Sequence, residues 1–414
     1  MLDDSNILIL PVLKKCMARS FRTILTYGWL LLFITACEKF EPVAPDNSSI
    51  LDGPVDGLNK AENLQFQRGD VAFNDEIFTT ANGLGPLFVA TSCGSCHPGD
   101  GKGHPFTTLT RFGQTNDIGN QFLNMGGPQL QHRAIPGFAP EQIPAGATST
   151  KLTPPANTGL GFLDAVTDAD ILGWADADDV NGDGISGVAN WITLKSYVIP
   201  RPESISQNGK YLARFGKKGA TYDLLQQTAQ AYNQDMGITS TYEYFDTYSN
   251  LEVDPEISNQ TLQDVIFYIK TLKAPVQRKQ GNDILAGYEL FSTIGCGKCH
   301  RAEMKTGISA VPSIANKTFY PYTDLLLHDM GSGLDDGYTE GSAKTSEWKT
   351  PALWGLGLSK NSQGGQYFLL HDGRARSIEE AILLHGGEAT KSQEGYKVLT
   401  EVEKNKLIRF LESL

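Results

Sequence analysis

Two copies of Cys-x-x-Cys-His are the feature of this sequence that most restricts its fold. The first is Cys93-Gly94-Ser95-Cys96-His97 and the second is Cys296-Gly297-Lys298-Cys299-His300. Two thiols at this spacing form thioethers with the two vinyl groups of a haem, and the histidine that follows binds its iron. The sequence therefore predicts two covalently bound c-type haems. Their attachment sites are Cys93, Cys96, Cys296 and Cys299, and their iron ligands are His97 and His300.

Two other uses of paired cysteines fit less well. Four thiolates can hold zinc, but about 200 residues separate these pairs, and a zinc site does not need histidine directly after both. A thioredoxin-like dithiol needs no histidine there either, and it requires a βαβ context that the sequence lacks. The two remaining cysteines, Cys16 and Cys37, lie near the N-terminus, so no pair is left for a disulfide elsewhere.

The N-terminus has the pattern of an exported lipoprotein. Four basic residues precede an apolar run at 29–34, which leads into Ile34-Thr35-Ala36-Cys37. This order is typical of a secretory signal, the final residues resemble a bacterial lipobox, and the run is too short to span a membrane. We expect a signal peptide over 1–36, lipidation of Cys37 and a flexible tether over 37–60. An uncleaved anchor, or a start at Met17, is the alternative.

The two halves of the chain repeat one plan, which is a helix, the Cys-x-x-Cys-His motif, loops and a closing helix. Apolar spacing predicts helices ahead of the motifs, at 68–78 and 283–291. The closing segments 265–272 and 407–414 align with each other, and Thr400-Glu401-Val402-Glu403 forms a capping box before the second. Because a small cytochrome c has this plan, we expect a mainly α fold with two tandem cytochrome c-like domains.

The first of these domains is much longer than the second. Pro275 ends the first closing helix, so we place an N-terminal domain at 61–275 and a C-terminal domain at 276–414. The chain between the motif and the closing helix is longer in the first half. This difference predicts a loop-rich insertion at 105–255.

One segment of the insertion matches the start of a calcium loop. In Asp179-Val180-Asn181-Gly182-Asp183-Gly184, oxygen ligands at Asp179, Asn181 and Asp183 alternate with other residues, and a glycine allows the sharp turn. Position twelve of the loop holds Asn190 in place of a glutamate. The alternative is an Asx-rich turn that uses the same residues without metal.

Several segments of the chain match a known family. They are EWKTPALWGLG at 347–357, FLLHDGRARSIEEAI at 368–382, RFG at 214–216, DMGIT at 235–239 and LHDMG at 327–331. From about residue 60 to its end, the chain resembles the bacterial di-haem cytochrome c peroxidase superfamily. It is more similar to the di-haem oxidoreductase branch, often labelled thiol oxidoreductase. The thiol label gains no support, because every cysteine of the mature domains is committed to haem.

The resemblance implies different roles for the two haems. The C-terminal haem accepts electrons from a partner and passes them on. The N-terminal haem meets hydrogen peroxide at an open iron face, where two electrons reduce one peroxide to two waters. Such a site also needs an acid/base group. We expect this group near Gln129, Gln131 and Glu141 and name Glu141 as the catalytic candidate, with a solvated carboxylate as the alternative.

Among the other histidines, His385 is the one that we expect to bind iron. The family commonly has a methionine ligand of the second haem after its His-Asp-Gly segment, and this chain has His385 at about that place. We expect a bis-histidine second haem, whose potential is lower than that of a methionine-ligated one, with a hydrogen-bonded loop histidine as the alternative. Arg374 and Arg376 are expected partners of haem propionates, or else surface arginines. His371 is expected to order a loop or a haem propionate and not to bind iron, and His328 is expected to be structural.

Five other residues are weaker candidates for the sixth ligand of the first haem. For each of five residues, iron ligation is less favoured than a surface, supporting or core role; they are His104, His132, Met125, Met236 and Met330.

These observations predict an exported di-haem c-type oxidoreductase that reduces hydrogen peroxide. A non-catalytic di-haem electron-transfer lipoprotein is one alternative. Another is an oxidase of a protein or organic substrate that uses high-valent haem iron. The net charge of −12 argues against nucleic-acid binding and suits a basic redox partner, such as a small cytochrome or cupredoxin. We expect the protein at the outer membrane, facing the periplasm, with membrane contact through its lipid anchor only.

Overall fold

The computed structural model describes residues 51–113, 120–278 and 281–414. The signal peptide, Cys37 and most of the tether predicted from the sequence lie outside these residues. Residues 48–414 belong to one compact unit. No helix in the part that the structure describes has the length and apolar character needed to cross a membrane.

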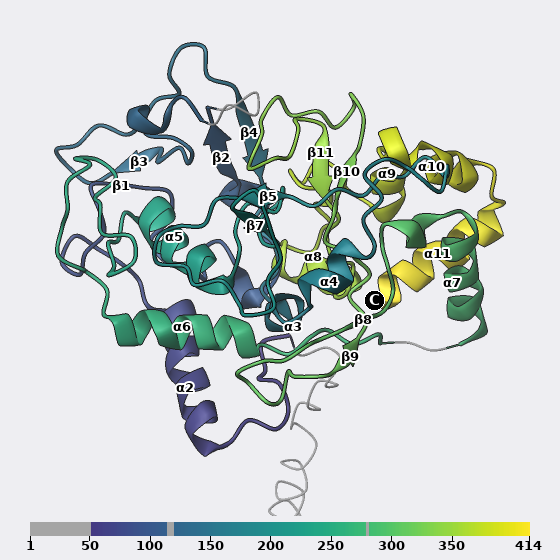
Figure 1. Ribbon diagram of the computed structural model, residues 1–414, viewed down its shortest axis with the longest axis horizontal. Coiled ribbons are helices and arrows are strands. Elements are labelled where there is room, and N and C mark those ends of the chain that lie inside the picture. The colour runs from purple at the N-terminus through teal and green to yellow at the C-terminus, as the bar shows by residue number, and fades with distance from the viewer. Residues whose placement is uncertain (1–50, 114–119, 279–280) are drawn as a thin grey trace, which may run out of the picture. The chain divides into compact units, whose positions relative to one another are not determined.

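Helices make up most of the regular structure, and four of the longest form two pairs. Helix α2 (Lys60–Asp70) packs on α6 (Asn259–Thr271), and α7 (Asn282–Thr293) packs on α11 (Glu401–Ser413). The pairs lie on opposite sides in Figure 1. The other α-helices are α3 (Leu160–Asp164), α4 (Asp168–Leu172), α5 (Leu224–Met236), α8 (Ser359–Ser362), α9 (Ile378–Leu383) and α10 (Thr390–Lys397).

The predicted helices before the motifs and at the end of each half are present, with shifted bounds. The first begins earlier than predicted and gives way to a π-helical turn at Val71–Asp75. Helix α11 begins at the predicted capping box, in which Thr400 and Glu403 each accept the other's backbone N–H. A second capping box, of Asn59 and Glu62, begins α2.

Each helix pair crosses at a glycine. A Cβ on Gly69 of α2 would lie 2.1 Å from a carbonyl oxygen of α6 and 2.6 Å from the Cβ of Tyr268. A Cβ on Gly287 of α7 would lie 2.2 Å from a carbonyl oxygen of α11 and 2.7 Å from the Cβ of Phe410. Any side chain at these glycines would push the helices apart. Because Tyr268 and Phe410 are equivalent in the predicted alignment of the closing segments, the repeat extends to the packing contact.

The strands are short, and all their pairings are antiparallel. Six of them lie in the predicted insertion. The pairs are β1 (Leu87–Phe88) with β3 (Arg133–Ala134), β2 (Leu109–Phe112) with β4 (Ser149–Leu152), β8 (Met304–Lys305) with β9 (Thr318–Phe319) and β10 (Leu327–Asp329) with β11 (Glu347–Lys349), while β7 (Lys210–Leu212) lies between β5 (Trp191–Ile192) and β6 (Ser206–Gln207).

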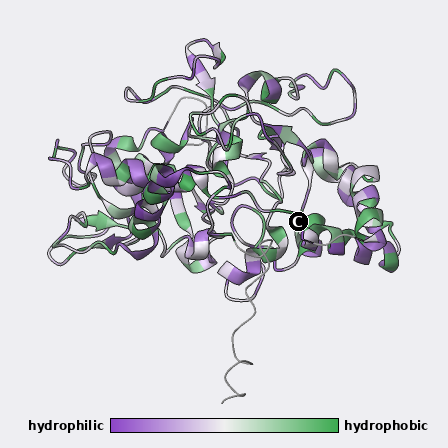
Figure 2. Ribbon diagram, turned by 90° about the horizontal axis from the view of Figure 1, so that it is seen from below, coloured by the Kyte–Doolittle hydropathy of each residue, from purple (hydrophilic) through white to green (hydrophobic). Residues whose placement is uncertain are grey.

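The main hydrophobic core crosses the domain boundary that we place at 275. Phe66 and Tyr268 from the first half belong to the same core as Met304, Ile314 and Trp354 from the second. A smaller core around α7 and α11 belongs to the C-terminal half alone. Hydrophobic and hydrophilic residues lie side by side on the helices in Figure 2, as expected when each helix buries one face. The halves therefore share apolar surface and are not separate compact bodies.

The end of the predicted tether is fixed to the body. The N–H of Val55 donates to the carbonyl of Thr271 at 2.8 Å, and the N–H of Lys273 donates to the carbonyl of Gly53 at 3.0 Å. Val55 and Leu58 also pack against the main core. The ordered body therefore begins before residue 60, because these residues bury apolar side chains beside the end of α6.

Candidate functional site

The first Cys-x-x-Cys-His motif closes on itself in a single turn. The N–H groups of Cys96 and His97 donate to the carbonyl of Cys93 at 3.1 and 3.0 Å. The Nδ1 of His97 lies 2.8 Å from the carbonyl oxygen of Pro155, to which it can donate. Burial lowers the pKa of His97 to about 4, so the ring is neutral at neutral pH. Its Nε2 is then available to bind iron.

The second motif has the same arrangement. The N–H of His300 donates to the carbonyl of Cys296 at 3.0 Å, and its Nδ1 lies 3.0 Å from the carbonyl oxygen of Tyr322. Burial, together with the charge of His385, lowers the pKa of His300 to about 4. This electrostatic effect indicates that the imidazoles of His300 and His385 lie near one another.

His385 is anchored in the manner of the two motif histidines. It follows α9, and its Nδ1 lies 2.6 Å from the carbonyl oxygen of Ala381, one helical turn earlier. Burial lowers its pKa. Histidines that bind metal usually donate their other ring N–H to a carbonyl or carboxylate, which fixes the tautomer. His97, His300 and His385 all have this partner, so all three fit iron ligation.

The four motif cysteines fit haem attachment better than thiolate chemistry. None of them forms a disulfide. Burial raises the pKa of Cys93, Cys96 and Cys296 to about 12, and it also raises the pKa of Cys299. Reactive and metal-binding cysteines have lowered pKa values instead. These thiols would hold two haems, with His97 and His300 as iron ligands and His385 as a second ligand of the His300 haem.

His328 lies at the centre of a buried ion network beside the second motif. Its Nε2 lies 2.8 Å from Asp324, its Nδ1 lies 2.8 Å from Glu388, and the Sγ of Cys299 is 3.6 Å away. Burial opposes its charge, but these hydrogen bonds raise the pKa of His328 to about 12. Cys299, Asp324 and His328 are close enough to hold a metal ion. Because both ring nitrogens already bond to carboxylates, a structural imidazolium fits better, in keeping with its predicted structural role.

Asp235 lies close to the first motif, and sequence reasoning did not single out its carboxyl. It is in the last turn of α5, where its carbonyl accepts the N–H groups of Val89 at 2.6 Å and Ala90 at 3.0 Å. The charge of Asp235 contributes to the raised pKa values of Cys93 and Cys96. Burial raises the pKa of Asp235 itself to about 7, against the opposing effect of Arg111.

Arg111 is held in place by two further contacts. Its Nε forms an ion pair with Glu340 at 2.7 Å, and its Nη1 donates to the side chain of Gln234 at 3.2 Å. A carboxyl at a helix C-terminus is electrostatically unfavourable, because the helix dipole is negative there. The charge of Arg111 lowers the pKa of Asp235 without an ion pair between them, and helix stability does not explain a carboxyl at this position. Asp235 belongs to the DMGIT segment that was singled out in the sequence. Backbone contacts with Val89 and Ala90 bring this segment close to the first motif.

Glu141, the predicted catalytic carboxylate, lies beside the same end of α5. It accepts the backbone N–H of Gln131 at 2.5 Å, and burial raises the pKa of Glu141 to about 7. The side chain of Gln131 donates to the carbonyls of Asn233 at 3.4 Å and Gln234 at 3.0 Å. Among the residues that the structure describes, the buried amide of Gln129 has no hydrogen-bond partner. Gln131 is the hydrogen-bonded link between Glu141 and the neighbours of Asp235.

The two arginines predicted to bind propionates are exposed and engaged elsewhere. Arg374 pairs with Asp372 at 2.6 Å, and the guanidinium of Arg376 lies 4.0 Å from the ring centre of Phe368. These contacts fit the alternative of surface arginines.

The residues considered as sixth ligands of the first haem have no hydrogen bond or ring contact to His97 in the described chain. The rings of Phe106 and Phe368 contact His104. His132 and Met125 are exposed, Met236 is in the main core, and Met330 packs beside Trp348.

In the predicted calcium loop, side-chain oxygens accept backbone N–H groups. Asp179 accepts the N–H of Gly184 at 3.0 Å, Asn181 accepts that of Asp183 at 2.9 Å, and Asp183 forms an ion pair with Lys298 at 3.0 Å. An Asx-rich turn explains these bonds, and calcium binding stays a prediction. The ion pair also joins the insertion to the second motif.

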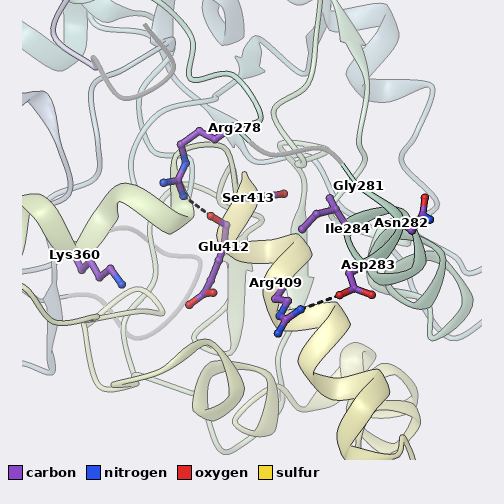
Figure 3. Close-up of a pocket in the computed structure, with 9 residues that line it drawn as sticks. All are labelled: Arg278, Gly281, Asn282, Asp283, Ile284, Lys360, Arg409, Glu412 and Ser413. Atoms are coloured by element: carbon purple, nitrogen blue, oxygen red, sulfur yellow. Dashed lines mark hydrogen bonds and ion pairs between the residues drawn. The ribbon is translucent and has the colours of Figure 1, made fainter. Parts of the chain in front are cut away.

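A pocket of about 750 Å³ lies apart from the motifs, beside α7 and α11. Figure 3 shows its wall, where Arg409 pairs with Asp283 at 2.8 Å. No residue predicted to bind haem or iron lines it, so we assign it no part in the site.

A match to a protein-family model agrees with the family resemblance. A family model described as "Di-haem oxidoreductase, putative peroxidase" matches residues 151–414. A search of curated proteins finds no match. Hydrazine synthase of Kuenenia stuttgartiensis, solved under 20 bar of xenon, is 14% identical over 91% of this chain and 96% of that chain, with a TM-score of 0.39. A MauG-like protein associated with microbial copper homeostasis is 14% identical over 91% and 95%, with a TM-score of 0.38. At TM-scores this low, neither likeness supports a statement about fold or activity.

Proposed function

Because the chain belongs to the di-haem oxidoreductase family, we propose that it reduces hydrogen peroxide at the haem of His97, with electrons relayed by the haem of His300. The family match includes the second motif, whereas the first motif precedes residue 151. The proposal for the first haem therefore rests on its Cys-x-x-Cys-His residues and on their surroundings.

Each helix pair would be the frame of a cytochrome c-like haem domain, with 105–255 as an insertion in the first. The repeated glycine crossings at Gly69 and Gly287 support this assignment. The equal anchoring of His97 and His300 to backbone carbonyls supports it as well.

The observation that carries the proposal is the difference between the two motif histidines. His300 lies near His385, and the Nδ1 of His385 is held by a backbone carbonyl, as is common for iron-binding histidines. No histidine that the structure describes has this relation to His97. The carboxyl of Asp235 acts on the cysteines of the first motif, and the charge of Arg111 acts on that carboxyl. One site is thus suited to electron relay, and the other to chemistry on a small substrate.

Haem iron, when bound, would supply the redox chemistry that breaks the O–O bond. Two electrons and two protons turn one hydrogen peroxide into two waters. Asp235 would take a proton from one peroxide oxygen on a carboxylate oxygen and return it to the other oxygen. Its pKa of about 7 suits both directions of transfer at neutral pH. Arg111 would stabilise the carboxylate form and negative charge that develops on the oxygen.

The remaining parts of the proposal concern partners and location. A net charge of −12 supports electron delivery by a basic small cytochrome or cupredoxin. The basic, apolar and lipobox-like segments up to Cys37 support export and a lipid anchor at the outer membrane. Lipidation is tested by mass spectrometry of the mature N-terminus, with C37S as the control.

Peroxide turnover by the purified haem-loaded protein tests the proposed reaction. We expect the half-reduced protein to consume one peroxide for every two electrons supplied. A protein with both haems low-spin and inert to peroxide in every redox state would be an electron carrier instead. One zinc per chain without a Soret band would contradict the haem assignment itself.

A further inference from the structure

Three lysines converge near the first motif without enough carboxylates to pair with them. The backbone N–H of Lys349, in β11, donates to the carbonyl of Lys217 at 3.2 Å, which places these two residues side by side. The Nζ of Lys102 donates to the carbonyl of Leu370 at 3.3 Å, next to His371. Backbone and side-chain contacts therefore bring three lysines from distant parts of the chain around His371.

An aromatic stack forms one wall of this cluster. The ring of His371 lies 4.4 Å from that of Trp348, with 8° between their planes. Trp348 precedes Lys349 in β11, and the Nζ of Lys218 lies 4.1 Å from its ring centre. The Nδ1 of His371 is buried and has no hydrogen-bond partner in the described chain. The Nδ1 of His371 is therefore an unpaired polar atom beside the three lysines.

The nearby carboxylates are already engaged by other cations. Asp372 pairs with Arg374 at 2.6 Å, and Asp324 pairs with His328 at 2.8 Å. The ammonium of Lys218 pairs with Asp336 at 3.1 Å and donates to three carbonyls. By contrast, neither Lys217 nor Lys349 has a side-chain hydrogen bond or ion pair among the described residues.

The charges in this cluster act on one another and on the first motif. Burial lowers the pKa of Lys102 and of Lys349 to about 8. Burial and the other two lysines hold the pKa of Lys217 well below its usual value. The N–H of Gly103, which follows Lys102, donates to the carbonyl of Pro154 at 3.0 Å, and the next carbonyl, of Pro155, lies 2.8 Å from the Nδ1 of His97. The cluster therefore lies near the first iron ligand, and the charge of Lys217 contributes to the low pKa of His97.

We propose that Lys102, Lys217 and Lys349 form an internal carboxylate-binding site, and that the propionate groups of the haem on Cys93 and Cys96 fill it. The three lysines are partly buried, and charges that are shielded from water without partners cost stability that a marginally stable protein has little of. A covalently held cofactor pairs with them permanently, whereas a transient anionic substrate would leave them unpaired in the resting state. This inference rests on the haem of the proposed function, but not on peroxide turnover.

Redox titration of the haem-loaded protein tests the proposal. K217Q and K349Q each remove a positive charge beside the propionates, which should favour the oxidised form of one haem. We expect about a tenfold change in its reduction equilibrium, which is a negative shift of about 59 mV for one electron, and no change at the other haem. K349R should keep the wild-type potential, as should K151Q, which removes an exposed lysine of β4.

Haem content and anion titration separate the remaining outcomes. A chain without a Soret band would contradict the proposed function, whereas a loaded protein whose potentials are the same in all variants would overturn this inference alone. Saturable binding of acetate or phosphate to the loaded wild type, lost in K217Q, would also overturn it by showing a site for free anions. If K217Q does not accumulate with haem, K349Q and K102Q provide the same test.

Discussion

The two halves of the molecule share a frame and differ in what faces the motif histidine. In each half, a glycine on the first helix meets an aromatic residue on the closing helix, Gly69 with Tyr268 and Gly287 with Phe410. In each half, the motif histidine is fixed by a backbone carbonyl. The second half adds another anchored imidazole, His385, whereas the first adds the charged groups of the insertion and of α5.

This difference indicates how one frame can support two functions. The frame would fix the proposed iron ligand, and the segments added outside the frame would set what surrounds the haem. In the second half, a short helix, α9, brings His385. In the first half, α5 ends beside the motif and brings Asp235, while β2 brings Arg111.

The largest predicted effect is on peroxide turnover, and it distinguishes the carboxyl of Asp235 from that of Glu141. We expect D235N to lower peroxide turnover by about 10²–10⁴-fold, because that range is typical of the loss of an acid/base group. The matched variant E141Q should lose far less, since Glu141 is linked to this region through Gln131. Steady-state turnover with a reduced donor measures both, and a larger loss in E141Q would restore Glu141 as the catalytic candidate.

The pH dependence of turnover tests the same assignment. Since burial raises the pKa of Asp235 to about 7, the proton-accepting form increases as the pH rises through 7. Wild-type kcat/KM should therefore rise over this range, and the rise should be absent in D235N. The free energy of unfolding should change in the opposite direction. The pKa of Asp235 is about 7 in the folded chain and near 4 in the unfolded chain, so the wild type should lose stability as the pH rises from about 4 to about 7. D235N keeps a neutral side chain and should therefore be more stable than the wild type at pH 8.

The next effect concerns the ion network of His328 beside the second motif. H328Q leaves Asp324 and Glu388 without their shared cation, which should cost about 3–5 kcal/mol in the free energy of unfolding. Because the folded-state pKa of His328 is raised to about 12, its contribution is complete below about 6.5 and declines as the pH rises toward 12. Urea unfolding at pH 6 and 9 should therefore show a smaller difference at pH 9. H132Q, at an exposed histidine, is the control.

The smallest effect tests whether the frames are equivalent. G69A and G287A should each lower the free energy of unfolding by about 1–3 kcal/mol, because each Cβ would overlap a carbonyl oxygen of the facing helix. G333A should be near neutral, since a Cβ there meets nothing within 4 Å. A strong effect at only one crossing would show that the frames are not equivalent.

The features predicted from the sequence are those with local causes. Amphipathic spacing and the capping box at Thr400 come from neighbouring residues, so the helices of both frames were predictable with shifts at their ends. The shared core was not predictable, because apolar residues such as Phe66 and Trp354 do not reveal from their positions that they meet.

The candidate site divides in the same way. The Cys-x-x-Cys-His spacing predicts the cysteines and histidines that would hold the haems, and the family resemblance pointed to His385. Asp235 was missed because its proximity to Cys93 depends on backbone bonds to Val89 and Ala90, far from it in the sequence. The lysine cluster was missed for a similar reason, since Lys102, Lys217 and Lys349 meet only in the folded chain.

The spin states of the two haems test the central comparison most directly. Electron paramagnetic resonance of the oxidised, haem-loaded protein should show one low-spin bis-histidine haem and one high-spin haem. H385A should convert the low-spin signal to high spin and leave the other signal unchanged. Two low-spin signals in the wild type, or a low-spin signal that survives in H385A, would contradict the account.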